Sequence, residues 1–484
     1  MRSVWKASAA LFVAFAALPA AAGAQLQAGE VVVADPDAFG GSGGLITVSQ
    51  SSGGQAPLSN NSISVAKLFS DPSGVALGPD GTLLVADPDA FGGSGGVIRV
   101  DPQTGQQSPL SNNDISGPNL FADPVGIAIA GSGTILVTDS NASGGDGAVI
   151  RVEATGQQTL VSNNQLSSTD LLADPFGIAV ERSGTLLVGD PSSPAPVSGS
   201  SGAVIAIDPS SGAQKLIANN DSSQEGLFGN PRGLAMETPG TVLVANTAAD
   251  PSSNGVILLN RFSGQQYALA AGGSFVAPTG ITMDLDGKAL VADSAAFGGG
   301  GGLIRVDPLT GASSAVAGDP SSADALFVNP TGLMVVPPTC QGHYATIVGT
   351  AGADAFTGSP GVDVIAGRGG DDIIDGREGA DLICGDQGRD RLLGKDGRDR
   401  ILGGSGPDVI LGGKGSDFAK GELGNDKIHG GGGSDRLYGQ RKRDTLVGGR
   451  GKDLLKGGYG RDKLIGGPGR DRLRGGPGKD RKRQ

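Results

Sequence analysis

The stretches GGSGPDVIL (residues 403–411) and GGKGSDFAK (412–420) are consecutive copies of one nine-residue unit that decides the fold of the C-terminal third. The unit reads G-G-x-G-x-D-x-U-x, with U apolar, and its aspartate recurs at every ninth residue from Asp354 to Asp480. A glycine stands five residues before each of the fifteen aspartates, and an apolar residue stands two residues after fourteen of them. The alternative to a folded repeat is a disordered low-complexity tail. Such a tail would have no reason to keep an apolar residue at a fixed position in every unit. The pattern predicts a parallel β-roll in which two units make one coil and residues eighteen apart stack.

The spacing places carboxylates beside glycine turns, which is the chemistry that calcium requires. Calcium takes six to eight oxygen ligands, and glycine tolerates the positive φ that turns backbone carbonyls toward an ion. Stacked strands lie about 4.8 Å apart, where neighbouring carboxylates repel by roughly 1 kcal/mol in water and by more in a drier site. A bound cation removes that repulsion, so we expect calcium to be the cofactor and folding to accompany its binding. The predicted metal ligands form two columns: Asp354, Asp372, Asp390, Asp408, Asp426, Asp444, Asp462 and Asp480; and Asp363, Asp381, Asp399, Asp417, Asp435, Asp453 and Asp471.

These units resemble the RTX, or haemolysin-type, calcium-binding repeats. The resemblance implies a parallel β-roll that folds outside the cell when calcium binds. The chain departs from the family pattern in one respect, because Arg or Lys often flanks the aspartate, as Arg389 and Arg391 flank Asp390. Such a side chain can pair with the carboxylate in place of the ion, so we expect weaker calcium binding at those units.

The second glycine of the unit is also missing at several positions. At 440–443, where the sequence is QRKR, no reliable turn is expected despite the aspartate that follows. The early units that lack this glycine have Arg368, Arg377, Asp386 and Lys395 in its place.

Residues 1–24 have the pattern of a secretory signal peptide, with Arg2 and Lys6 before an apolar run from Ala9 to Leu18. That run, at about ten residues, is too short to span a bilayer, and no later segment could do so. A buried N-terminal helix is the alternative. We therefore predict a secreted or cell-surface protein without a transmembrane segment, divided into the signal (1–24), a propeller (25–337) and a calcium-binding roll (338–484).

Two further features bear on compartment and partners. Cys340 and Cys384 are the only cysteines, and in an oxidising space we expect one disulfide, with two buried free thiols as the alternative. Residues 1–339 carry 11 Lys and Arg against 28 Asp and Glu, whereas 340–484 carry 26 against 21. The acidic part argues against nucleic-acid binding. The basic end from Arg470 to Arg483 either contacts an anionic surface or is solvated.

A longer repeat covers residues 30–337. DPSGVAL at 71–77, LLVAD at 83–87 and GVIRVD at 96–101 each return about every 52 residues, six times in all, and a looser fourth element follows. Four short strands per unit indicate a β-propeller, here with six blades. Because the chain begins at a second-type element, Val31, and ends at a first-type one, Leu333, we expect the last strand to complete the first blade. The fold class is therefore all-β, a six-bladed β-propeller followed by a parallel β-roll.

The motif P-x-G-I-A followed by G-T-L-L-V-A-D resembles NHL-repeat propellers and, more distantly, gluconolactonase-type propellers. Loops such as DPDAF (35–39 and 87–91) and the paired asparagines at 60–61, 112–113, 163–164 and 219–220 are expected on one face. They form either a rim for a cation or polar ligand, or turns repeated by duplication. The partner of the propeller is not indicated.

The alternative function, a metal-dependent lactonase-like hydrolase in the propeller channel, lacks residues that it would need. The gluconolactonase-type family typically has Asn just before the glycine of the first-strand motif, and both histidines, His343 and His429, lie outside the propeller. We predict no catalytic residues and a binding or display role for the propeller. The positions where that Asn would stand hold Ser73, Val125, Phe176, Arg232, Thr279 and Thr331.

Overall fold

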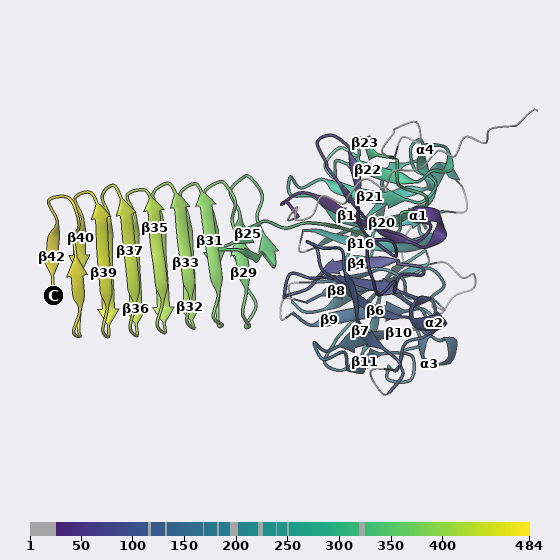
Figure 1. The fold of residues 1–484 in the computed structure, drawn as a ribbon, viewed down its shortest axis with the longest axis horizontal. Helices are drawn as coiled ribbons and strands as arrows, with labels where there is room; N and C mark the ends of the chain where they lie inside the picture. Colours follow the sequence, from purple (N-terminus) through teal and green to yellow (C-terminus); the bar gives the residue numbers. More distant parts are fainter. Residues whose placement is uncertain are drawn as a thin grey trace, which may run out of the picture.

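A computed structural model describes residues 26–484 apart from 115–117, 131–132, 168, 182, 194–201, 221–225, 239, 249–250 and 319–324. The predicted signal peptide, 1–24, lies outside the described residues. The protein is all-β, with a six-bladed propeller from which a long parallel roll projects (Figure 1). None of the helices in the described part of the chain has the length and apolar character needed to cross a membrane.

The propeller consists of six four-stranded antiparallel sheets. Within each blade the strands are given from the channel outward. The first blade contains β24 (Leu333–Val335), β1 (Val31–Asp35), β2 (Gly44–Val48) and β3 (Gln55–Asn60); the second, β4 (Gly74–Leu77), β5 (Leu83–Asp87), β6 (Gly96–Val100) and β7 (Gln107–Asn112); the third, β8 (Pro124–Ile129), β9 (Ile135–Asp139), β10 (Ala148–Val152) and β11 (Gln158–Ser162). The fourth contains β12 (Ile178–Val180), β13 (Leu186–Asp190), β14 (Ala203–Ile207) and β15 (Gln214–Asn219); the fifth, β16 (Asn230–Thr238), β17 (Thr241–Thr247), β18 (Gly255–Asn260) and β19 (Gln266–Ala271); the sixth, β20 (Pro278–Met283), β21 (Ala289–Asp293), β22 (Gly302–Val306) and β23 (Ser313–Ala317).

The ring closes as the sequence predicts, because β24 pairs with β1 and completes the first blade. The carboxylate of Asp35, at the end of β1, accepts the N–H groups of Val328 (2.8 Å) and Asn329 (3.1 Å) and holds the chain that enters β24. Closure leaves no open blade edge between the first and last repeats. All five residues of β5 are buried, since each blade is covered on both faces by its neighbours.

The roll is built from two parallel sheets of eight strands each. The repeated apolar residue of each unit faces inward, and these side chains form one continuous buried ladder from Phe356 to Leu464. One sheet contains β27 (Ile347–Val348), β29 (Val364–Ala366), β31 (Leu382–Gln387), β33 (Arg400–Ser405), β35 (Phe418–Leu423), β37 (Arg436–Arg441), β39 (Leu454–Tyr459) and β41 (Arg472–Arg474). The other contains β28 (Ala355–Thr357), β30 (Ile373–Asp375), β32 (Arg391–Asp396), β34 (Val409–Lys414), β36 (Lys427–Gly432), β38 (Thr445–Arg450), β40 (Lys463–Ile465) and β42 (Arg481–Arg483).

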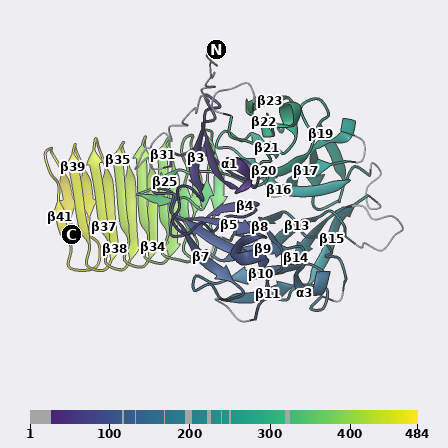
Figure 2. The same ribbon diagram turned by 45° about the vertical axis from the view of Figure 1, so that its right-hand side comes forward.

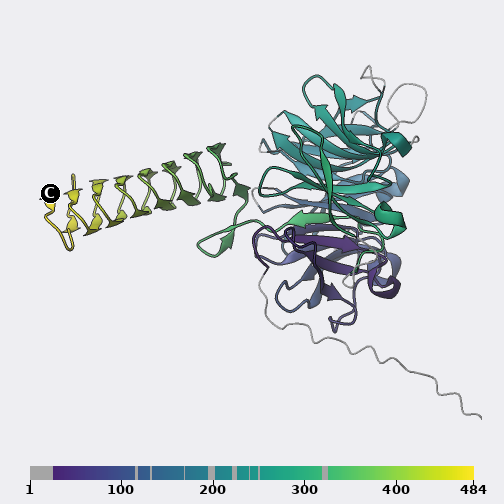
Figure 3. The same ribbon diagram turned by 90° about the horizontal axis from the view of Figure 1, so that it is seen from above.

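The roll leaves the propeller on one side only, and its C-terminal end is the point farthest from the blades (Figure 2). The short turns α1 (Ala38–Gly41), α2 (Ala90–Gly93), α3 (Ala142–Gly145) and α4 (Ala296–Gly299) lie together on the opposite side of the propeller, as the sequence predicts for the loops that follow the second strands (Figure 1). A view from above shows the two sheets of the roll edge-on as a regular stack of coils (Figure 3). A 3-10 turn, η1 (Pro251–Ser253), precedes β18.

The junction contains a hairpin and a polar network. The hairpin consists of β25 (Thr339–Cys340) and β26 (His343–Tyr344), and Cys340 forms a disulfide with Cys384 in β31. Closing this loop, which spans 44 positions, is worth up to about 4 kcal/mol in the chain-entropy account.

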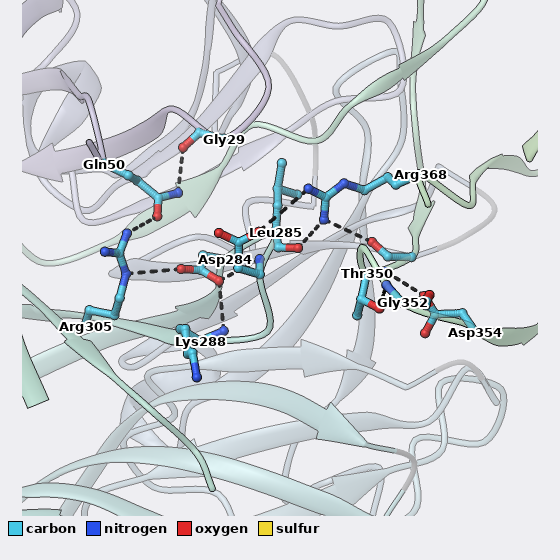
Figure 4. A network of polar contacts seen from close by, with 12 residues as sticks. Gly29, Gln50, Asp284, Leu285, Lys288, Arg305, Thr350, Gly352, Asp354 and Arg368 are labelled. Carbon is cyan, nitrogen blue, oxygen red and sulfur yellow. Dashed lines mark hydrogen bonds and ion pairs between the residues drawn. The ribbon is translucent and has the colours of Figure 1, made fainter. Parts of the chain in front are cut away.

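The network starts at Arg368, whose guanidinium donates to the carbonyl of Leu285 and lies 3.8 Å from the Asp286 carboxylate (Figure 4). Asp284, in the same turn, accepts the N–H of Asp286 at 2.9 Å and pairs with Arg305 at 3.3 Å. The first coils of the roll are thus attached to a turn of the propeller that is itself fixed by ionic contacts.

Candidate metal centre

From the unit of Asp372 onward, the turns of the roll have a left-handed backbone at two positions of every unit except that of Asp426, where only one of the two is left-handed. These are the fourth and the second residue before the aspartate, as in Gly413 (φ 119°) and Gly415 (φ 129°) before Asp417. At the latter position a side chain would also collide with the neighbouring coil, since a Cβ built on Gly397 would lie 1.4 Å from the carbonyl oxygen of Gly379. The glycines of the pattern are therefore needed for both torsion and close backbone approach.

Several turns keep this conformation without glycine. Arg368, Arg377, Asp386 and Lys395 adopt φ between 70° and 77° at the second position of their units. The expectation that no reliable turn remains at 440–443 is wrong, because Gln440 (φ 80°) and Lys442 (φ 74°) take the required torsions there. The reason is that the hydrogen bonds of adjacent coils over-determine the backbone, which offsets the roughly 1–3 kcal/mol of strain per residue.

The predicted ligand aspartates form the two expected columns, joined by one repeated hydrogen bond. The backbone N–H of each aspartate donates to Oδ1 of the aspartate eighteen residues later, from Asp354 to Asp372 (2.8 Å) through to Asp462 to Asp480 (3.0 Å). Asp444, which follows the irregular QRKR turn, keeps its place in the column with bonds of 2.9 and 3.0 Å. From Asp372 onward, each carboxylate is thereby fixed to the preceding coil through one oxygen only.

The second carboxylate oxygen has no hydrogen-bond partner. From Asp372 to Asp471, Oδ2 of every column aspartate is buried and receives no donor, and Oδ1 of Asp363 is in the same situation. A Cβ built on Gly385 would lie 2.3 Å from Oδ2 of Asp390 and 2.6 Å from the carbonyl oxygen of Gly403. A carboxylate oxygen and a backbone carbonyl oxygen thus border the same small space, which stays open because glycine has no side chain. A buried carboxylate oxygen without a partner costs free energy unless a cation compensates its charge.

Burial raises the pKa of the column carboxyls from Asp363 to Asp462, and the backbone N–H that each accepts opposes this rise. At Asp381, Asp408 and Asp444, carboxylates of the same column raise the pKa further. The pKa of Asp381 and Asp408 rises to about 7, and that of Asp372 and Asp417 to about 6. A divalent cation among them favours the ionised form and reverses this shift.

The first two units differ from the rest. Thr350 donates to Asp354 through both its N–H (2.7 Å) and its hydroxyl (2.9 Å), and Ser359 makes the same contacts with Asp363 (2.7 and 3.1 Å). Both contacts of each pair go to one oxygen, Oδ2, so the carboxylate of Asp363 still has a buried Oδ1 without a donor. The columns therefore begin with units whose hydroxyls compete with any ion.

The flanking cations do not pair with the column carboxylates. Arg389, Arg391, Arg398 and Arg400 are exposed, while Asp390 and Asp399 between them are buried. The ion pairs within the roll join Lys395 to Asp375 and Lys414 to Asp396, which are outside the columns. The expectation that a neighbouring basic side chain takes the place of the ion is wrong, because residues on either side of an inward-facing aspartate point outward.

The donor set fits calcium only with a large contribution from the backbone. In the part of the chain that the structure describes, no three His, Cys, Asp or Glu side chains converge on one point. An ion held by the columns would therefore take most of its six to eight oxygens from backbone carbonyls of the glycine turns, with carboxylates supplying the charge.

The propeller channel offers little room for a metal or substrate. The six glycines of the first-strand motif face the next blade so closely that a Cβ on Gly177 would lie 1.8 Å from the carbonyl of Arg232, and one on Gly332 would lie 2.2 Å from that of Ser73. This approach leaves a cavity of 90 Å³ at the axis. The hydroxyls of Ser73 and Thr279, where a lactonase-type Asn would stand, donate to backbone carbonyls.

The paired asparagines close loops. Asn61 donates to the carbonyl of Phe69 (2.7 Å) and accepts its N–H (3.2 Å), and Asn220 and Phe228 repeat both contacts. The carboxamide of the second asparagine is therefore already used, which favours the interpretation of these residues as repeated turns.

Sequence reasoning missed the ring of glutamines that holds the blades together. In five blades the outer strand begins with a glutamine whose Oε1 accepts the N–H of a leucine in the chain entering that blade, as Gln107 does from Leu68 at 2.6 Å. Its side-chain nitrogen reaches Ser59 of the preceding blade at 3.3 Å. The signal available in the sequence was the recurrence of glutamine at this position: Gln55, Gln107, Gln158, Gln214 and Gln266.

Comparison with known proteins identifies the roll. Overlapping segments between residues 348 and 481 match the family described as RTX calcium-binding nonapeptide repeat (4 copies). This C-terminal segment consists of RTX calcium-binding repeats, as the sequence predicted. No curated protein matches the chain.

Solved structures resemble the propeller at low identity. The crystal structure of a nidogen/laminin complex contains a chain with 15% identity and a TM-score of 0.45, and the match covers 63% of this chain and 97% of that one. A gluconolactonase from Xanthomonas campestris has 16% identity and a TM-score of 0.39, with 63% and 89% covered. An aldose sugar dehydrogenase from Streptomyces coelicolor, solved with PQQ, has 18% identity and a TM-score of 0.36, with 54% and 80% covered.

Proposed function

We propose that the chain is an exported calcium-binding protein in which residues 338–484 form a calcium-stabilised roll and residues 25–337 form a propeller that binds or displays a partner. The fifteen column aspartates are the proposed ligands, together with carbonyls of the glycine turns. The signal-like sequence at 1–24 and the engaged cysteines support export to an oxidising space.

One observation carries the calcium assignment. In a segment that matches calcium-binding repeats, a buried carboxylate oxygen without a donor recurs in register along both columns. Protein folds rarely leave such an atom unpaired even once, and here it recurs at thirteen consecutive column aspartates, from Asp363 to Asp471. A column of cations shared between coils compensates every one of these oxygens and also removes the repulsion between stacked carboxylates.

Calcium titration of the full chain tests the proposal. Asp408→Asn removes one charge from the middle of a column, and we expect fewer or weaker sites by calorimetry, with at least about a tenfold loss for the sites it borders. Asp396→Asn is the matched control, because Asp396 is exposed, outside the columns, and paired with Lys414 at 2.7 Å. This control should bind calcium like the unmodified chain.

Circular dichroism of the full chain in chelator provides the second measurement. We expect the propeller signal to persist, because its blades bury apolar strands and close into a ring without any ion. The signal of the roll should form only on addition of calcium. A complete β signal in chelator, together with no heat on adding calcium, would contradict the proposal.

A further inference from the structure

The outer half of the roll has an unbalanced surface charge. Between residues 423 and 484 the chain has 17 Lys and Arg, and its only acidic residues are the seven aspartates of the two columns. Five of those aspartates, from Asp426 to Asp462, are buried. No ion pair joins any of these cations to a carboxylate in the described structure of the roll, where the pairs within it involve Lys395 and Lys414. The surface of this outer half of the roll, which we call the rod, is therefore basic, in contrast to the acidic propeller.

One face of the rod combines this charge with apolar side chains in a regular order. On the sheet of β35, β37 and β39, each coil presents one cation and one apolar group, because the central residue of each strand points into the core. The strands pair in register, so the groups are repeated with the spacing of the coils, about 4.8 Å. We call this the basic-aromatic face; it consists of Arg400, Phe418, Lys420, Arg436, Tyr438, Leu454 and Lys456.

The cations of this face lie against its rings. Arg400 is 4.9 Å from the centre of the Phe418 ring, and Lys456 is 5.0 Å from that of Tyr438. The two rings are themselves 5.4 Å apart. A groove of 910 Å³ borders the face on the side of the propeller. Its lining includes Arg400, Phe418 and Arg436 of the face, together with the column carboxylates Asp381, Asp399 and Asp417. Charge and apolar surface therefore alternate along a straight track that several coils share.

We propose that the basic-aromatic face binds a linear acidic polysaccharide that runs along the stack of coils. Each sugar of such a chain offers one carboxylate and one apolar ring face, and its length along the chain is comparable to the coil spacing. Each coil supplies one cation for the carboxylate and one apolar side chain for the sugar ring. A membrane surface has no counterpart to this alternation of rings and cations. A single-stranded nucleic acid also offers anionic groups and stacking rings, so the match between sugar length and coil spacing is what favours a polyuronate over it.

The test uses the full chain at saturating calcium, with a short oligogalacturonate as the probe and its methyl ester as the uncharged control. We expect binding of the acid and not of the ester. The triple variant Lys420→Ala, Arg436→Ala, Lys456→Ala should lose roughly tenfold in affinity, as three exposed ion pairs would provide. A matched triple on the opposite sheet, Lys427→Ala, Lys463→Ala, Arg481→Ala, removes the same charge and should lose much less.

A single-residue series separates stacking from charge. Tyr438→Ala should weaken binding several-fold, and Tyr438→Phe should leave it unchanged. Circular dichroism at the same calcium concentration confirms that each variant keeps the roll, so a failure of calcium-dependent folding is distinguishable from a failure of this inference. Absence of binding by the calcium-loaded chain overturns the proposal. Equal losses in the two triples, or equally tight binding of single-stranded DNA or anionic vesicles, would show unspecific attraction and would also overturn it.

Discussion

At the scale of single residues, glycine has two separate roles in the roll: it adopts left-handed torsions, and it allows close approach of a neighbouring backbone. In the roll it supplies torsions that other residues adopt only under strain, as Arg377 does at φ 70°. It also admits a neighbouring carbonyl at a distance that excludes any side chain, as Gly397 does. Torsional strain costs about 1–3 kcal/mol and can be offset by surrounding hydrogen bonds. A collision with the backbone cannot be offset locally, so substitution should affect the two kinds of position differently.

Substitution of two glycines in the roll tests this distinction. Gly397→Ala should destabilise the calcium-loaded roll by more than about 3 kcal/mol, because its Cβ would meet the Gly379 carbonyl at 1.4 Å. Gly432→Ala, where a Cβ meets nothing within 4 Å and φ is not left-handed, should change stability by less than about 0.5 kcal/mol. Thermal unfolding of the two full-length variants at fixed calcium measures the difference. Similar melting temperatures would refute the steric account.

Buried carboxylates in the propeller predict an unusual dependence on pH. Asp139, at the end of β9, is fully buried and accepts the N–H groups of Ala122 and Asp123 (2.8 and 3.0 Å). Burial raises its pKa to about 6, an effect that these N–H groups partly oppose. The folded state therefore binds a proton more tightly than the unfolded state, whose pKa is near 3.8. The protonated carboxyl of Asp139 therefore contributes to the free energy of unfolding. This contribution is fully present below pH 3.8 and is lost as the pH rises through 6.

The chain contains a neutral counterpart of this residue. Asn246 occupies the same place in the fifth blade and accepts the N–H groups of Gly229 and Asn230 at 3.0 and 3.1 Å. We expect Asp139→Asn to match the unmodified chain near pH 4 and to exceed it at pH 7, by up to about 3 kcal/mol for a shift of two pKa units. Denaturant unfolding at the two pH values gives the difference. A variant that loses stability at pH 7 would mean that the N–H groups keep the carboxylate charged.

At the scale of elements, the sequence predicted those features that a repeat phase determines. The period of nine placed the aspartates in two columns and the apolar residues in one core, and the circular order of strand types predicted closure by β24. The roles of side chains that bridge elements could not be predicted in this way. Gln107 binds both a linker and the preceding blade, so its function depends on which strands are neighbours in space.

Predictions from neighbouring residues in the sequence failed where hydrogen bonds between adjacent coils determine the backbone conformation. The turn at 440–443 lacks both glycines, yet β37 and β39 pair in register across it, with Gln440 opposite Gly458. The basic residues that flank the aspartates were interpreted from adjacency along the chain. In a strand, however, adjacent side chains point to opposite faces, so these cations became part of the outer surface.

At the scale of the whole molecule, the roll and the propeller meet through a few specific contacts. Arg368 belongs to the third unit of the roll and contacts Leu285 and Asp286 of the propeller. The network behind this turn continues from Asp284 through Arg305 to Gln50, which donates to the carbonyl of Gly29 (Figure 4). If calcium orders the first coils as proposed, we expect it also to fix this turn of the sixth blade and, through it, the first blade.

Two matched arginine variants test this coupling. Arg368 and Arg377 both occupy the second position of a unit with left-handed φ of 75° and 70°, but only Arg368 contacts the propeller. Arg377→Gly should stabilise the calcium-loaded roll by about 1 kcal/mol through relief of backbone strain. Arg368→Gly gains the same relief and loses the contacts, so calcium should raise the melting temperature of the propeller less in this variant than in Arg377→Gly. Differential scanning calorimetry of both chains, with calcium and with chelator, measures the two shifts. Equal shifts would mean that other contacts at the junction, such as Tyr344 packed against the core of the first two blades, connect the stability of the roll to that of the propeller.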